Sequence, residues 1–180
     1  MRAMLFTLNR LAFAAPLSAA LLLGTVSAVP FTNAKLPFQA DLPSGWTQRG
    51  YPNNLPGMLV AAPGTPPPVV LQFFFPPYKS GGNDARALTD FIGGVEEGAT
   101  GGGQAVLKKL SERPLTVAGI KGQLRDYTLT FKANGQTVLT QLWFGIGPKN
   151  LLQFQVVTGA KATAAQKAIF TRVLSTVKLK

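Results

Sequence analysis

The stretch from residue 119 to residue 158 constrains the fold most, because apolar alternation and turn residues agree along its length. Asn134-Gly135 separates two alternating runs, and this dipeptide favours a two-residue hairpin turn with positive φ at both positions. Such a turn fixes which residues face each other across the hairpin. The predicted pairs are Lys132 with Thr137, Phe131 with Val138, Leu129 with Thr140, Tyr127 with Leu142 and Arg125 with Phe144.

This register gives both strands an apolar face and a polar face. The apolar face holds Tyr127, Leu129, Phe131, Val138, Leu142 and Phe144. The polar face holds Asp126, Thr128, Thr130, Lys132, Thr137 and Gln141. A third run at 151–158 follows a turn at 147–150 and completes a three-stranded antiparallel meander. If Phe144 lies beside Phe154 on the buried face, the loop after Ile146 must hold an odd number of unpaired residues or a bulge.

The segments before and after the meander predict further strands and two helices. Strands are expected within 36–46, at 57–62 and at 69–75; the last is almost continuously apolar, which suits a strand covered on both faces. Residues 47–55 are interpreted as a loop, and 105–110 as a weak strand. Asp84 is expected to cap a helix whose apolar face is Ala85, Leu88, Phe91, Ile92 and Val95. A second amphipathic helix is predicted at 161–176.

The first 28 residues have the pattern of a secretory signal peptide. Arg2 and Arg10 precede a short apolar run, and Val26-Ser27-Ala28 supplies small residues for cleavage after Ala28. The run at 11–23 is shorter than the roughly 20 residues that a membrane span needs. The prediction is therefore a signal peptide at 1–28, a flexible leader at 29–35, a single domain at 36–180, and export to the periplasm, cell envelope or extracellular space.

Composition argues against several classes of activity. The chain has no histidine and no cysteine, which removes the commonest general base and the usual zinc and thiol chemistry. We therefore expect no catalytic, cofactor-binding or metal-binding residues, and no enzyme. The formal net charge of +11 becomes +9 without the signal peptide, from 16 basic and 7 acidic residues. This charge favours anionic partners, but the basic residues are scattered, so no specific nucleic-acid binding is expected.

Four segments carry a resemblance to a known family. They are FQADLPSGW at 38–46, the run at 119–131, Trp143-Phe144, and FTRVLSTVKL at 170–179. Together with the order of the elements, they resemble the PsbP-like superfamily, which includes DcrB-type exported bacterial proteins. The resemblance implies an α+β chain forming an α/β/α sandwich, in which helices flank an antiparallel sheet with a C-terminal three-stranded meander. It does not imply one function, since proteins of one fold bind different things.

Two functions remain open from the sequence. The first is an exported, non-enzymatic interaction or structural module that binds an envelope protein or an anionic envelope polymer. Its candidate contacts are Trp143, Leu139, Lys108, Lys109 and Lys121, with Trp143 and Leu139 forming an outward apolar patch unless a helix covers the tryptophan. The alternative is a small-ligand carrier with a pocket between the sheet and a helix. A cavity larger than a few waters favours the carrier, and an exposed apolar or basic patch favours the module.

Overall fold

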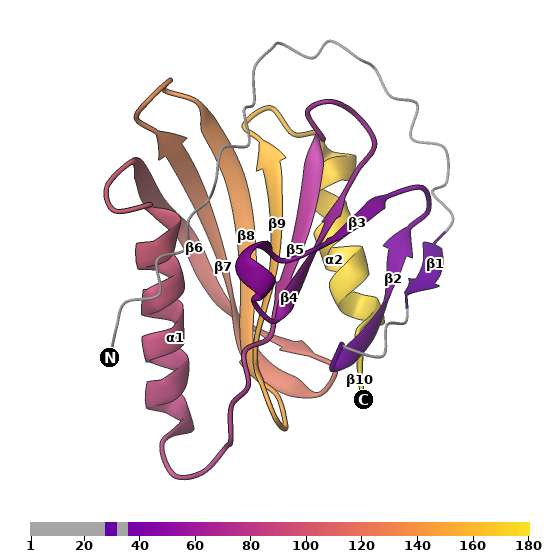
Figure 1. The fold of residues 1–180 in the computed structure, drawn as a ribbon, viewed down its shortest axis with the longest axis vertical. Helices are drawn as coiled ribbons and strands as arrows, with labels where there is room; N and C mark the ends of the chain where they lie inside the picture. Colours follow the sequence, from indigo (N-terminus) through magenta and orange to yellow (C-terminus); the bar gives the residue numbers. More distant parts are fainter. Residues whose placement is uncertain (1–27, 32–35) are drawn as a thin grey trace.

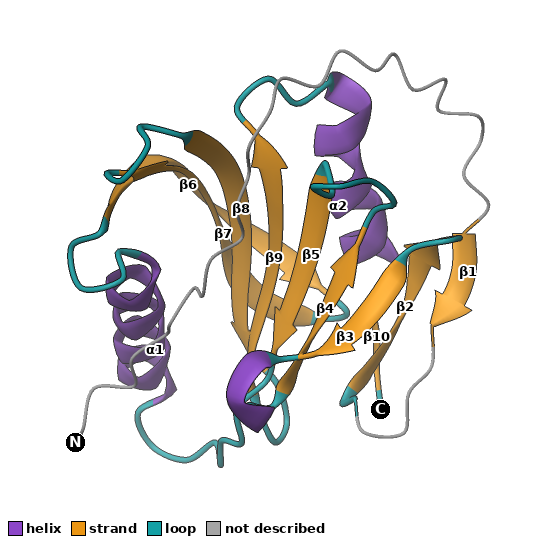
Figure 2. Cartoon of the chain, turned by 45° about the horizontal axis from the view of Figure 1, so that its top comes forward, coloured by secondary structure: helices purple, strands orange, loops and turns teal. Residues whose placement is uncertain are grey.

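The computed structural model describes residues 28–31 and 36–180, which form an α+β fold in layers (Figure 1). Helix α1 (Asp84–Ala99) covers one face of a seven-stranded antiparallel sheet. Helix α2 (Ala164–Thr176) and a small three-stranded sheet cover the other face (Figure 2). The predicted fold class is confirmed. The predicted signal peptide lies outside the described residues except for Ala28, as do residues 32–35 of the predicted leader.

The large sheet joins two groups of consecutive strands through the pairing of β5 with β9. In spatial order it comprises β3 (Thr47–Gly50), β4 (Gly57–Ala61), β5 (Val69–Phe74), β9 (Leu151–Gly159), β8 (Thr137–Ile146), β7 (Ile120–Phe131) and β6 (Ala105–Val117). The small sheet comprises β1 (Ala28–Phe31), β2 (Phe38–Pro43) and β10 (Lys178–Leu179), with β2 in the middle. The predicted meander is present, and β6 adds a fourth consecutive strand to it.

The main core lies between the sheet and the α2 layer. Phe38 of β2 packs on Phe154 with ring centroids 4.8 Å apart, and Trp143 packs on Phe154 at 5.3 Å. All three side chains have no exposed surface. A second core on the other face forms where Ile92 and Val95 of α1 meet aromatic and aliphatic residues of β7 and β8. Every residue of β5 is buried, as the continuous apolar run predicts for a strand covered on both faces.

The hairpin between β7 and β8 is shifted by two residues from the predicted register. Leu129 faces Val138 rather than Thr140, because the connection is a four-residue loop closed by a bond from the Gly135 N–H to the Phe131 carbonyl. Among the two residues of the expected turn, only Gly135 has positive φ; Asn134 instead accepts the Gln136 N–H on its side chain at 2.9 Å. A shift of two preserves which face each side chain occupies, so the predicted apolar face is nevertheless correct.

Trp143, not Phe144, faces Phe154. The loop from 147 to 150 holds an even number of residues, and an odd number or a bulge was the condition for Phe144 to lie there. Three other local predictions were wrong. Residues 47–50 form β3 instead of a loop. The cap of α1 is Asn83, whose side chain accepts the Arg86 N–H. Residues 29–31 of the predicted flexible leader pair with β2 as part of β1.

Candidate binding site

The helix α2 covers only part of its face of the large sheet. It contacts β2 and β9, and Figure 1 shows it away from β6 and β7. The strand registers therefore leave a row of side chains crossing the sheet beyond the core. This row runs from Lys108 on β6 through Thr128 on β7 and Leu139 on β8 to Thr158 on β9.

A trough of about 240 Å³ lies over Leu139 and Thr158 of this row and over the neighbouring row of Ser111, Asp126, Gln141 and Val156. It is called the trough below. It is lined by Leu110, Ser111, Asp126, Tyr127, Leu139, Thr140, Gln141, Val156, Thr158 and Lys167. Leu110, Leu139 and Val156 provide apolar surface, and the remaining positions bring hydroxyl, amide and charged groups. Apolar surface with a few polar groups at its border is the usual make-up of a binding site.

Asp126 is the acidic group of the trough, and its carboxylate is fully engaged. Gln141 Nε2 donates to Oδ1 at 2.6 Å, Arg113 donates to Oδ2 at 3.1 Å, and the Ser111 hydroxyl also donates to Oδ2. Burial alone would raise the pKa of this carboxyl, but the bonds from Ser111 and Gln141 and the charge of Arg113 outweigh it and lower the pKa. Asp126 therefore remains ionised and organises neighbouring side chains, leaving little capacity for a ligand.

One lysine lines the trough, and a second lies in the cross-strand row beside it. Lys108 is exposed on β6, and Lys167 reaches the trough from α2. Neither forms an ion pair with another described residue. Because Arg113 already pairs with Asp126, these two ammonium groups leave the trough with a surplus of positive charge.

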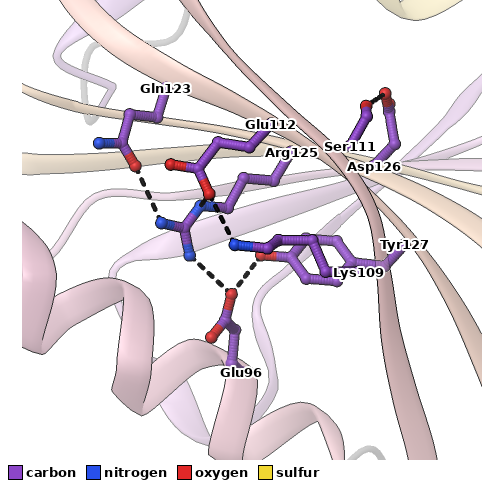
Figure 3. Close-up of polar contacts among 8 residues, drawn as sticks. All are labelled: Glu96, Lys109, Ser111, Glu112, Gln123, Arg125, Asp126 and Tyr127. Carbon is purple, nitrogen blue, oxygen red and sulfur yellow. Dashed lines mark hydrogen bonds and ion pairs between the residues drawn. The ribbon is translucent and has the colours of Figure 1, made fainter.

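A second polar cluster lies on the opposite face of β6 and β7 and holds helix α1 in place (Figure 3). Arg125 donates to Glu96 of α1 at 2.7 Å and also lies 3.2 Å from Glu112 on β6. The Tyr127 hydroxyl donates to Glu96 as well. Burial and this bond to Glu96 raise the pKa of Tyr127, so the phenol stays protonated. Apart from Arg125 Nε, which meets Glu112 as an ion pair without a hydrogen bond, these groups bond to one another, which is the arrangement of a structural contact.

The structure brings together only two of the five residues predicted to bind a partner. Leu139 and Lys108 share the row beside the trough. Trp143 is fully buried, and its Nε1–H donates to the Leu115 carbonyl at 2.9 Å, so the outward apolar patch that required it is absent. Lys109 points to the opposite face and pairs with Glu112 at 2.8 Å. Lys121 lies at the far end of the β6–β7 hairpin.

Sequence reasoning missed most of the residues that line the trough. Leu110 is the extra residue of a β-bulge between Lys109 and Ser111. No glycine or other turn residue in the sequence indicates this bulge. Lys167 falls within the predicted second helix, and only the packing of α2 brings it to the sheet. The polar face of the predicted hairpin, which contains Asp126 and Gln141, was the one available signal.

A second hollow of about 490 Å³ lies between the small sheet and the end of α2. It is lined by Pro30, Phe31, Gln39, Ala40, Asp41, Ser175, Thr176 and Lys178. One carboxylate and one ammonium balance its charge, and the Thr176 hydroxyl already accepts the Asp41 N–H at 2.9 Å. Despite its larger volume, this hollow shows no preference for one ligand chemistry, so the trough is the better candidate.

Comparison with solved structures identifies the architecture. The solution structure of cyanobacterial PsbP (CyanoP) from Synechocystis sp. PCC 6803 superposes with a TM-score of 0.62 at 15% identity, covering 92% of this chain and all of that one. The chain has a PsbP-like fold. LpqN of Mycobacterium tuberculosis, described as involved in cell envelope biogenesis, gives a TM-score of 0.57 at 13% identity over 87% of this chain and 92% of LpqN.

A protein from Bacteroides thetaiotaomicron also shares the architecture, with a TM-score of 0.53 at 11% identity. The match covers 84% of this chain and 48% of that protein. No family model and no curated protein matches the sequence. At these identities, the likeness establishes the PsbP-like fold and leaves the function to be argued from the site.

Two further properties bear on the class of the site. Across the described ranges 28–31 and 36–180, acidic residues do not gather into a group of three or more that could hold a metal ion. Within the same ranges, neither helix has the length and apolar character to cross a membrane.

Proposed function

We propose that this chain is an exported, non-catalytic binding module of the cell envelope, and that it binds an anionic partner along the trough. The observation that carries the proposal is a pair of lysines without ion pairs among the described residues: Lys167 lines the trough, and Lys108 lies in the cross-strand row that contains Leu139. Negative charge on a partner would be attracted to both lysines, while its apolar groups would cover Leu139 and Leu110. The signal-peptide pattern and the fold shared with LpqN support an envelope location.

The shape of the trough favours a segment of a larger partner over an enclosed small ligand. Pockets that enclose drug-sized ligands usually have about 300–1,000 Å³, and the trough has about 240 Å³. Its walls come from four adjacent strands and a single residue of α2. A carrier for a small amphipathic anion is the second candidate, because the volume still exceeds that of a few waters, each about 30 Å³.

The first test uses charge reversal and site-specific crosslinking. A photoreactive residue at position 139 would be introduced into the full chain in its own cells, with and without the double substitution Lys108→Glu and Lys167→Glu. The matched control is Lys121→Glu with Lys149→Glu, two exposed lysines at the opposite end of the strands, which change the net charge equally. Binding of purified protein to polyglutamate would be measured in parallel.

We expect the trough variant to lose its crosslinked partner and to bind polyglutamate about tenfold more weakly, because two attractive contacts become repulsive. The control should retain both. Equal losses in the two variants would show that only overall charge matters and would overturn the proposal. If a small anion co-purifies with the wild-type protein but not with the trough variant, and no partner is crosslinked, the carrier function would be favoured over the binding module.

A further inference from the structure

Strand β6 forms a free edge of the large sheet that the trough does not use. It is last in the strand order and pairs only with β7. At its start the Lys132 N–H bonds to the Gln104 carbonyl, so the backbone groups of residue 104 point towards β7. Backbone groups alternate direction along a strand. The N–H and C=O groups of Leu107 and Lys109 therefore point outward, and the described residues provide them with no partner.

The edge is open over only part of its length. A bulge between Lys109 and Ser111 interrupts the ladder. Beyond the bulge, Val117 pairs with Ile120 across the two-residue turn, so its backbone groups point towards β7. Because direction alternates along the strand, those of Pro114, three residues earlier, point outward. Proline has no N–H to donate, so it blocks strand addition there. The Ala105 N–H already bonds to the Thr100 carbonyl at 3.0 Å, so the accessible part of the edge is the segment 106–109.

The side chains along this segment are unusual for a free edge. Val106 is 52% exposed and Leu110 is 53% exposed; among the described residues only Val29 is another large apolar side chain of comparable exposure. Lys108 lies between them on the same face as Val106, and Lys109 follows. Two copies of this edge placed together would bring like charges close, which is how natural sheets resist self-association. The same charges would attract an acidic strand.

We infer that the edge at 106–109 accepts an extended segment of a partner protein in which pairs of apolar residues alternate with pairs of acidic residues, because each face of this edge carries one apolar residue and one lysine. The segment would receive the outward N–H groups of Leu107 and Lys109 and donate its own to their carbonyls, as in strand addition to other sheet edges. Its apolar residues would cover Val106, and its acidic residues would lie beside Lys108. The backbone groups of this edge are not part of the trough. Lys108 belongs to both proposals, but Lys167 lines the trough alone, so Lys167→Glu separates the two surfaces.

The test measures hydrogen exchange of individual backbone amides by NMR on the folded full-length protein. The probe is a synthetic peptide of roughly ten residues, the upper end of usual strand lengths, in which pairs of valines alternate with pairs of glutamates and both ends are blocked. The control peptide replaces each glutamate with lysine. Two variants distinguish the contribution of the backbone N–H from that of the side-chain charge. Lys109→Pro removes the outward N–H donor, whereas Lys109→Ala removes the charged side chain and keeps the N–H.

We expect the acidic peptide to slow exchange at Leu107 and Lys109, and the basic peptide to leave it unchanged. Lys109→Pro should weaken binding about fivefold more than Lys109→Ala, as expected for one lost backbone hydrogen bond. Lys167→Glu, which alters the trough, should retain the protection.

Three results would overturn the inference. One is unchanged exchange at Leu107 and Lys109 with the acidic peptide, a readout that does not depend on whether Lys109→Pro folds. Another is equal protection by both peptides. The third is protection that rises with protein concentration in the absence of peptide, which would identify a second copy of this chain as the occupant.

Discussion

At the scale of single residues, Gly122 shows how closely the backbone of β7 approaches the buried tryptophan. A Cβ at this position would lie 2.7 Å from Cε2 of Trp143 and would also meet the carbonyl of Phe144. Real Cβ atoms do not approach so closely, and neither neighbour can move, since the indole is fully buried and bonded to Leu115. The Gly119–Gly122 segment therefore has a packing role in addition to its turn.

We expect Gly122→Ala to destabilise the fold by about 3 kcal/mol, as overpacking of a filled core does. Urea unfolding followed by Trp fluorescence would measure the change. The control is Gly93→Ala in α1, where nothing lies within 4 Å of the added Cβ and the change should stabilise by about 0.5–1 kcal/mol. If Gly122→Ala left the free energy of unfolding unchanged, β7 and Trp143 would be less closely packed than described.

At the scale of elements, the sequence predicted which face of a strand is apolar better than it predicted the pairing register between strands. The two strands around Asn134 kept their apolar face because a shift of two residues preserves the side-chain alternation. By contrast, the partner of Phe154 depended on the length of a loop, because both faces of β9 are covered and its pattern does not distinguish them. The trough was predictable only in part. Its polar floor appears in the hairpin pattern, whereas Leu110 depends on a bulge and Lys167 on helix packing.

Helix α1 depends on a few contacts near its C-terminal end, where Glu96 bonds to Arg125 and Tyr127. We expect Glu96→Gln to destabilise the protein by about 1 kcal/mol, a value discounted because the Glu96 side chain is 33% exposed. Amide exchange should accelerate in α1 and stay unchanged in α2. Glu97→Gln is the matched control, because Glu97 is exposed and its side chain has no partner among the described residues. Equal exchange in the two variants would contradict this anchoring role.

At the scale of the whole molecule, a strongly basic chain relies on a small number of well-placed carboxylates. Its 7 acidic residues face 18 basic ones, and hydrogen bonds lower the pKa of Asp84, mainly from Ser80 and Tyr78. The pKa of Glu112 is also lowered, mainly by its bond from Lys109. With Asp126, these carboxylates fix the loop before α1, the bulged strand and the trough. The same groups that shape the proposed binding surface therefore also tie stability to pH.

The direction of this pH dependence follows from the lowered pKa values. A carboxyl whose pKa is lower in the folded state stabilises the fold above its unfolded pKa, about 4, and loses that contribution as pH falls through the folded value. The chain has no histidine, so unfolding free energy should be nearly constant from about pH 5 to 8 and fall below about pH 4. Asp126→Asn should lessen that fall in urea titrations at pH 6 and pH 3. Asp90→Asn should keep the wild-type fall, because its pair with Arg86 is exposed. An Asp126→Asn protein with an undiminished loss at pH 3 would show that general charge repulsion, rather than the bonds at the trough, governs acid unfolding.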